Sequence, residues 1–277
     1  MGAHTFLRLG RPILAERAAG SYGSGCYIFI GSAAVATFLI VHGAWGGAWS
    51  WNKFVVPMLR DAGETVHAVT LTGLGERTHL ASPDVSLDTH IQDVVNVLFY
   101  EDLTDVFLVG HSYGGNVITG VADRVPERLQ QLVYLDAATP ADGQSSADSF
   151  PSRRQELEEQ AAQSGDGWKI EPGAVPPDQA SEITEWARPR RSPMPIKTMT
   201  TALKLTRGET TLPRTFVYCT IGKEAGSPQA ARAERIRNDP RWRFFELNTG
   251  HNLHYSAPQE TVAILLELAK SPVAATR

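Results

Sequence analysis

The stretch that decides the fold is Asp105-Val106-Phe107-Leu108-Val109-Gly110-His111-Ser112-Tyr113-Gly114. Its apolar run, 105–109, predicts a buried strand, and the segment 115–124 that follows has the pattern of a helix. A serine between glycines at such a turn has its hydroxyl exposed above the sheet, because the backbone bends sharply there. We therefore predict that Ser112 is a nucleophile.

Apolar runs alternate with helix-patterned segments on both sides of this stretch. We predict strands at 37–42, 65–71, 105–109, 129–135, 215–220 and 243–247, and helices at 49–62, 87–100, 115–124, 229–238 and 258–270. This alternation is typical of a mainly parallel sheet flanked by helices. The fold class is therefore α/β.

The alternation is interrupted between two of the predicted strands. Residues 141–212 are rich in proline and charge and too long for a plain loop, so we interpret them as an inserted helical cap over the carboxyl ends of the strands. The core would then consist of residues 35–140 and 213–277. We read residues 1–34 as a loosely attached N-terminal extension.

Composition argues against several classes of protein. The chain has 277 residues, of which 42% are hydrophobic, and a formal net charge of −4, so no basic surface favours nucleic acid. Its two cysteines, Cys26 and Cys219, do not suggest a disulfide framework, and the apolar stretch that precedes residue 37 is too short to span a bilayer. We expect a cytoplasmic enzyme with no membrane partner, and the sequence leaves a homodimer open.

A serine nucleophile needs a base and a group that stabilises the developing oxyanion. Among eight histidines we favour His251, because Thr249-Gly250-His251 lies between the last predicted strand and the last helix. His254, three residues later, is the competing candidate. The backbone amides of Tyr113 and Ala44, the latter in the loop after the first strand, are the expected oxyanion hole.

Other side chains near these loops are expected to line a substrate pocket. They are Trp45, Trp49 and His111, although the place of His111 in the Ser112 turn favours a structural role and tryptophans near a core are more often packing residues.

With these elements the chain resembles the α/β-hydrolase superfamily, and within it the small esterases that include plant methyl esterases, hydroxynitrile lyases and their bacterial relatives. The resemblance covers residues 36–270. It depends on 38–45 (FLIVHGAW), 72–77 (TGLGER), the Ser112 turn, 134–136 (YLD) and Gly250-His251.

The resemblance leaves the third member of a catalytic triad uncertain. The plant relatives carry their carboxylate after the strand that corresponds to 215–220, at the position of Lys223, and lysine cannot replace it. Asp136, at the end of an earlier strand, is the favoured acid, since some relatives carry their acid there. Glu224 is the alternative acid. The non-catalytic interpretation of Asp136 is that it caps the end of its strand.

We therefore expect a serine hydrolase that cleaves small to medium carboxylic esters through an acyl-enzyme, without a cofactor or a metal. A lactonase or amidase with the same triad is an alternative, and so is a non-catalytic protein of this fold that binds a small ligand. Lyase activity is disfavoured, because Gly43 and Asn252 stand where the lyases have threonine and lysine.

Overall fold

The predicted parallel sheet is present in the computed structural model, which describes residues 35–149, 152–173 and 180–271. Its strands are β1 (Thr37–Val41), β2 (Thr65–Val69), β3 (Val106–His111), β4 (Leu129–Leu135), β7 (Arg214–Cys219) and β8 (Trp242–Leu247). They lie in the order β2-β1-β3-β4-β7-β8, and every neighbouring pair is parallel. The carboxyl ends of all six strands therefore lie at one edge. The predicted extension, residues 1–34, lies outside the described residues.

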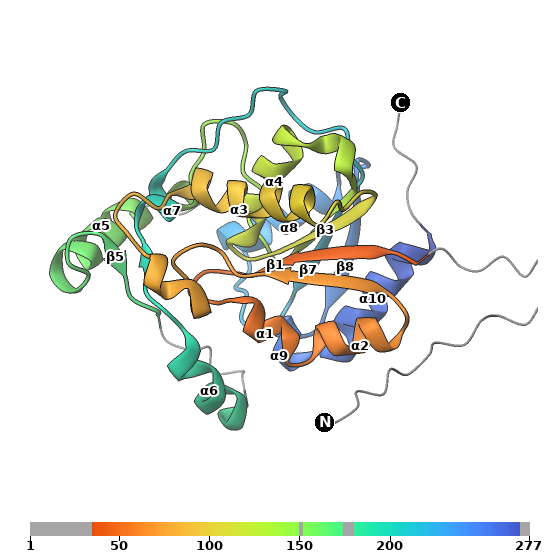
Figure 1. Ribbon diagram of the computed structural model, residues 1–277, viewed down its shortest axis with the longest axis horizontal. Coiled ribbons are helices and arrows are strands. Elements are labelled where there is room, and N and C mark those ends of the chain that lie inside the picture. The colour runs from red at the N-terminus through yellow and green to blue at the C-terminus, as the bar shows by residue number, and fades with distance from the viewer. Residues whose placement is uncertain (1–34, 150–151, 174–179, 272–277) are drawn as a thin grey trace, which may run out of the picture. The chain divides into compact units, whose positions relative to one another are not determined.

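Helices cover both faces of this sheet (Figure 1). One layer consists of α3 (Leu87–Tyr100), α4 (Gly114–Arg124) and α8 (Pro228–Arg237). The other consists of α1 (Ala48–Asn52), α2 (Val55–Asp61), α9 (Leu253–Ser256) and α10 (Pro258–Lys270). The fold is that of an α/β protein with a sheet between two helical layers.

Alternation of side chains along β1 shows why both layers are needed. Leu39 and Val41 are buried toward the layer that contains α3 and α4, whereas Phe38 and Ile40 are buried toward α1, α2 and α10. Successive side chains on a strand point to opposite faces, so a strand that is apolar at every position requires cover on both. Each such burial contributes roughly 1.5–3 kcal/mol.

One predicted helix is wrong in its continuity. The segment 49–62 forms two helices, α1 and α2, separated at Lys53 and Phe54, where Phe54 leaves the helical region with φ −129° and ψ −61°. Pro57 explains the break, because its ring would clash with the carbonyl of Lys53 in a continuous helix and it has no N–H to bond that carbonyl. In the first turn of α2 the same proline is tolerated.

The segment 141–212 contains more than helices. It includes α5 (Arg153–Ser164), α6 (Ser181–Ala187) and α7 (Lys197–Thr200), together with an antiparallel ribbon of β5 (Lys169–Ile170) and β6 (Met194–Pro195) that the sequence did not predict. Leu157, Ile170 and Met194 belong to the same hydrophobic cluster as α3 and α4. The segment thus packs into the compact unit formed by residues 34–277.

Four short 3-10 helices complete the described elements. They are η1 (Gly75–Leu80), η2 (Pro126–Arg128), η3 (Ser146–Ser149) and η4 (Arg188–Arg190). None of the helices in the described part of the chain is long and apolar enough to cross a bilayer.

Candidate active site

Ser112 lies at a strained turn between β3 and α4. Its φ is +54°, in the left-handed region that serine seldom adopts. The flanking glycines allow close approach of the backbone, since a Cβ on Gly114 would lie 2.7 Å from the Val41 carbonyl oxygen and one on Gly110 would lie 2.8 Å from the Gly114 oxygen. The turn is therefore tightly packed against the end of β1, as a nucleophile elbow requires.

The structure brings Ser112, His251 and Asp136 together from three separate loops. His251 Nε2 lies 2.9 Å from Ser112 Oγ, and His251 Nδ1 lies 2.5 Å from Asp136 Oδ2. Because an ionised carboxylate only accepts, Nδ1 carries a proton and donates it, which leaves Nε2 free to accept from the serine hydroxyl. This is the order of hydrogen bonds that activates a serine.

Asp136 is the carboxylate that contacts His251, whereas the alternative, Glu224, is exposed. Burial by itself would raise the pKa of Asp136, but the hydrogen bond and charge of His251, together with the charge of Lys223, lower it to about 2. Asp136 is therefore ionised throughout the neutral range. It also has a left-handed backbone, with φ +45°.

His111 and the competing candidate His254 are buried beside His251. His111 Nε2 donates to the His251 carbonyl oxygen at 2.8 Å, and the two rings lie 4.8 Å apart. Burial, and then the nearby His251, lower the pKa of His111 to about 3, and burial also lowers the pKa of His254. Both rings are neutral near pH 7, and the contacts of His111 indicate that it supports the His251 loop while it also lines the site.

The loop after β1 carries Ala44 and faces Ser112. It is held by His42, whose Nε2 accepts from the Leu71 amide at 3.1 Å while its Nδ1 donates to the Gly43 carbonyl at 2.7 Å. On the other side, the Tyr113 hydroxyl lies 2.9 Å from His90 Nδ1 in the core. The Tyr113 side chain thus anchors the start of α4, and its amide directly follows the nucleophile.

A cavity of about 190 Å³ opens onto Ser112. The predicted residues Ala44, Trp45, Trp49, His111 and His251 all line it. The indole N–H of Trp49 is buried and has no hydrogen-bond partner among the described residues.

Sequence reasoning did not predict several other residues that line this cavity, among them Ser50, Ala187, Arg191, Asn252 and Tyr255. Ala187 and Arg191 come from the segment 141–212, which has no motif. That segment is joined to the site by Trp45, whose Nε1 donates to the Ile170 carbonyl at 3.1 Å. Only the packing of this segment against Trp45 could have identified Ala187 and Arg191 as lining residues.

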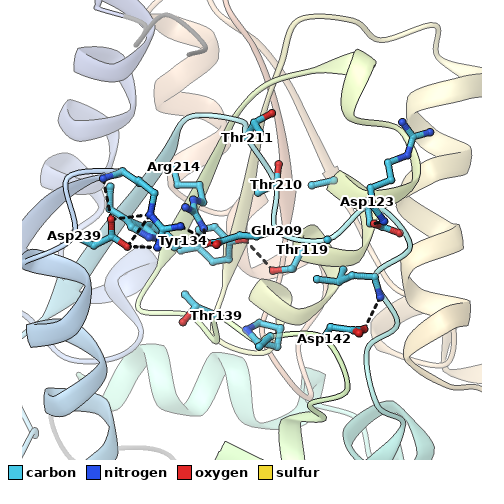
Figure 2. A pocket seen from close by; sticks show the side chains of 18 of the residues that line it. Thr119, Asp123, Tyr134, Thr139, Asp142, Glu209, Thr210, Thr211, Arg214 and Asp239 are labelled. Carbon is cyan, nitrogen blue, oxygen red and sulfur yellow. Dashed lines mark hydrogen bonds and ion pairs between the residues drawn. The ribbon is translucent and has the colours of Figure 1, made fainter. Parts of the chain in front are cut away.

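A larger cavity, of about 680 Å³, lies between α4, α8 and the loop before β7 (Figure 2). Some of its charged side chains form ion pairs: Glu209 pairs with Arg214 and Arg241, each at 2.7 Å. None of its lining residues is Ser112, His251 or Asp136.

Within residues 35–149, 152–173 and 180–271, no group of three His, Cys, Asp or Glu side chains is placed to hold a metal ion.

Known proteins resemble this chain over most of its length. The sequence pattern of the Alpha/beta hydrolase family matches residues 38–264. The chain is 35% identical over 245 residues to the Carbendazim hydrolyzing esterase of Nocardioides sp. (strain SG-4G), covering 84% of this chain and 100% of that protein. It is 28% identical over 263 residues to Putative methylesterase 14, chloroplastic, of Arabidopsis thaliana, and the match covers 88% of this chain and 75% of that protein.

A solved structure gives the same result. The extracellular alpha/beta-hydrolase from a Paenibacillus species, described as sharing structural and functional homology with Tobacco Salicylic Acid Binding Protein 2, superposes with a TM-score of 0.71. It is 25% identical, and the match covers 84% of this chain and 98% of that one. The chain therefore belongs to the alpha/beta hydrolase family.

Proposed function

We propose that Ser112, His251 and Asp136 form a catalytic triad that hydrolyses small to medium carboxylic esters through an acyl-enzyme. The chain is a carboxylic ester hydrolase, as its esterase and methylesterase relatives are. The observation that carries the assignment of roles is the continuous set of hydrogen bonds from Ser112 Oγ through His251 to Asp136, at 2.9 and 2.5 Å, which opens onto a cavity.

The first half of the reaction forms the acyl-enzyme. Ser112 Oγ attacks the ester carbonyl carbon while its proton passes to His251 Nε2. When the tetrahedral intermediate collapses, the bond to the alcohol oxygen breaks and His251 returns that proton to the leaving alcohol. Asp136 remains ionised and stabilises the imidazolium that exists between these two events.

The second half consumes water. His251 takes a proton from a water molecule, whose oxygen attacks the acyl carbon, and the bond to Ser112 Oγ then breaks as the serine regains its proton. The acid and the free enzyme are the products. The amides of Ala44 and Tyr113 hold the oxyanion in both halves, which typically contributes about 3 kcal/mol for each donor.

The cavity supports a substrate of limited size. Its volume of about 190 Å³ is bounded by Trp45, Trp49 and Tyr255, so we assign it an acyl or alcohol group with an apolar surface. The names of the relatives suggest two probes besides p-nitrophenyl acetate, namely carbendazim and a small methyl ester. A cytoplasmic location remains a prediction from the sequence, which leaves a homodimer open.

The test is replacement of the nucleophile. Ser112→Ala should lower the rate of p-nitrophenyl acetate hydrolysis by several orders of magnitude, and it should abolish labelling by a fluorophosphonate, since Ser112 Oγ is the hydroxyl that lies 2.9 Å from His251 Nε2. The exposed Ser271→Ala is the matched control and should behave as the wild type. Circular dichroism checks that both variants fold.

Three results would change the proposal. A Ser112→Ala variant that keeps more than about a tenth of the activity would exclude this nucleophile. Absence of fluorophosphonate labelling in the wild type would favour a ligand-binding protein. A lactone or anilide that is hydrolysed faster than the ester would favour a lactonase or an amidase.

A further inference from the structure

The carboxylate of Asp136 is shared between two donors on one oxygen. Its Oδ2 accepts from His251 Nδ1 at 2.5 Å and from Lys223 Nζ at 2.7 Å. The side chains of Lys223 and Asp136 are only 11% and 3% exposed, so water does little to screen this contact. The third member of the triad is thus already neutralised by a buried ammonium before any imidazolium forms.

The sheet explains how a lysine reaches this place. Strand β7 lies between β4, which ends just before Asp136, and β8, which leads to the His251 loop. Lys223 lies on the turn after β7, directly after Gly222, whose φ is +77°. The turn after β7 therefore lies between the carboxyl ends of β4 and β8. This placement lets Lys223 contact Asp136, although 87 residues separate them.

Other charged and titratable groups also face Asp136 and His251. Arg232, from α8, donates to the Ala137 carbonyl at 2.8 Å, and the Tyr218 hydroxyl group lies close enough for its pKa to be raised in part by Asp136. His111 and His254 pack near His251, and burial keeps both neutral. Among the cations of the described residues, Lys223 is the one with a side-chain bond to the Asp136 carboxylate.

A positive charge at this oxygen has two opposite effects. It holds the carboxylate ionised and oriented toward β7, which favours the geometry that His251 needs. It also offsets the negative charge that would stabilise protonated His251, because the ammonium and the imidazolium compete for the same oxygen. The second effect favours the unprotonated imidazole, which is the form that can accept the serine proton.

We propose that Lys223 is a positioning residue that keeps His251 available as a base in weakly acidic solution by sharing the carboxylate of Asp136. The inference rests on the proposed serine esterase function. Without the ammonium, Asp136 would stabilise the imidazolium more strongly, so the acidic limb of the pH profile should move to higher pH. The reaction itself should remain possible at alkaline pH.

The experiment compares neutral, polar and cationic replacements. Lys223→Met removes charge and donor, Lys223→Gln retains an N–H donor without the charge, and Lys223→Arg retains the charge. The exposed Lys204→Met is the matched control. For each variant kcat/KM with p-nitrophenyl acetate is measured between about pH 4.5 and pH 9, together with the Tm.

In both neutral variants we expect the acidic limb of the kcat/KM profile to move to higher pH by about one unit. At the acid end this shift corresponds to roughly a tenfold loss of kcat/KM. At alkaline pH their rates should stay within about threefold of the wild type. Lys223→Arg should restore the wild-type limb, and Lys204→Met should not change it.

Two results would overturn the inference. One is an unmoved acidic limb in a folded Lys223→Gln variant, even if its Tm falls, since this would make Lys223 purely structural. The other is a limb in Lys223→Arg that moves as far as in Lys223→Met. Failure of the proposed function has a different signature, because the wild type would then show no labelling of Ser112 at all.

Discussion

At the scale of single residues, the least expected feature is the environment of Asp136. The side chain is almost fully buried and its backbone is left-handed, a conformation that aspartate tolerates better than most residues. Burial opposes its charge, yet the contacts with His251 and Lys223 lower its pKa. A carboxylate held ionised in this way can orient an imidazole without taking its proton.

The corresponding prediction concerns that orientation. Asp136→Asn keeps the size of the side chain but favours the wrong imidazole tautomer, so we expect kcat for p-nitrophenyl butyrate to fall by a factor on the order of 10³ to 10⁴. Glu224→Gln is the control and should change kcat little, because Glu224 is exposed. Steady-state kinetics would contradict the assignment if the two variants lost activity in the opposite order.

At the scale of secondary-structure elements, the junction of β3 and α4 packs closely against the end of β1. The first residue of α4, Gly114, faces the carbonyl oxygens of Val41 and His42, which would lie 2.7 and 2.9 Å from a Cβ at this position. These carbonyls belong to backbone and cannot rotate away. A side chain here would push α4 away from the end of β1.

We therefore expect Gly114→Ala to lower the free energy of unfolding by about 1–3 kcal/mol, in spite of the higher helix propensity of alanine. Gly173→Ala is the matched control, because a Cβ there has no neighbour within 4 Å among the described residues and should change stability by less than about 0.5 kcal/mol. Urea titration measures both values. Equal stabilities would show that the junction has room to adjust.

At the scale of the whole molecule, buried histidines make the fold sensitive to acid. Burial lowers the pKa of His42 and His90 to about 4 and that of His111 to about 3. The unfolded chain takes up protons as the pH falls through about 6.5, whereas the folded protein does not until near pH 4. Their contribution to stability is complete above about pH 6.5 and is lost as the pH falls toward 4.

The predicted consequence is a steep loss of stability in weak acid. Each of these histidines should cost about 3 kcal/mol by pH 4, so the midpoint of urea unfolding should fall markedly between about pH 7.5 and pH 5. The slope of the unfolding free energy against pH measures how many protons unfolding takes up. His42→Gln should lower this number by about one, while the exposed His79→Gln should leave it unchanged. A midpoint that is constant over this range would contradict the prediction.

The sequence by itself determined the elements whose signals are local. The strand Leu129–Leu135 and the helices Leu87–Tyr100 and Pro258–Lys270 end where the pattern of apolar residues predicts. The α/β hydrolase fold was likewise predictable, because the turn around Ser112 and the alternation of elements are properties of neighbouring residues. The break at Phe54 was also encoded locally, in Pro57, although the apolar pattern predicts one continuous helix over 49–62.

Only the tertiary structure decided which distant residues meet. Asp136 and Glu224 were both plausible partners for His251 in sequence, and the strand order placed Asp136 at 2.5 Å and left Glu224 exposed. Lys223 contacts Asp136, and Arg191 lines the cavity, for the same reason. Such contacts arise from the register and order of strands that lie far apart in the chain, and no local pattern records them.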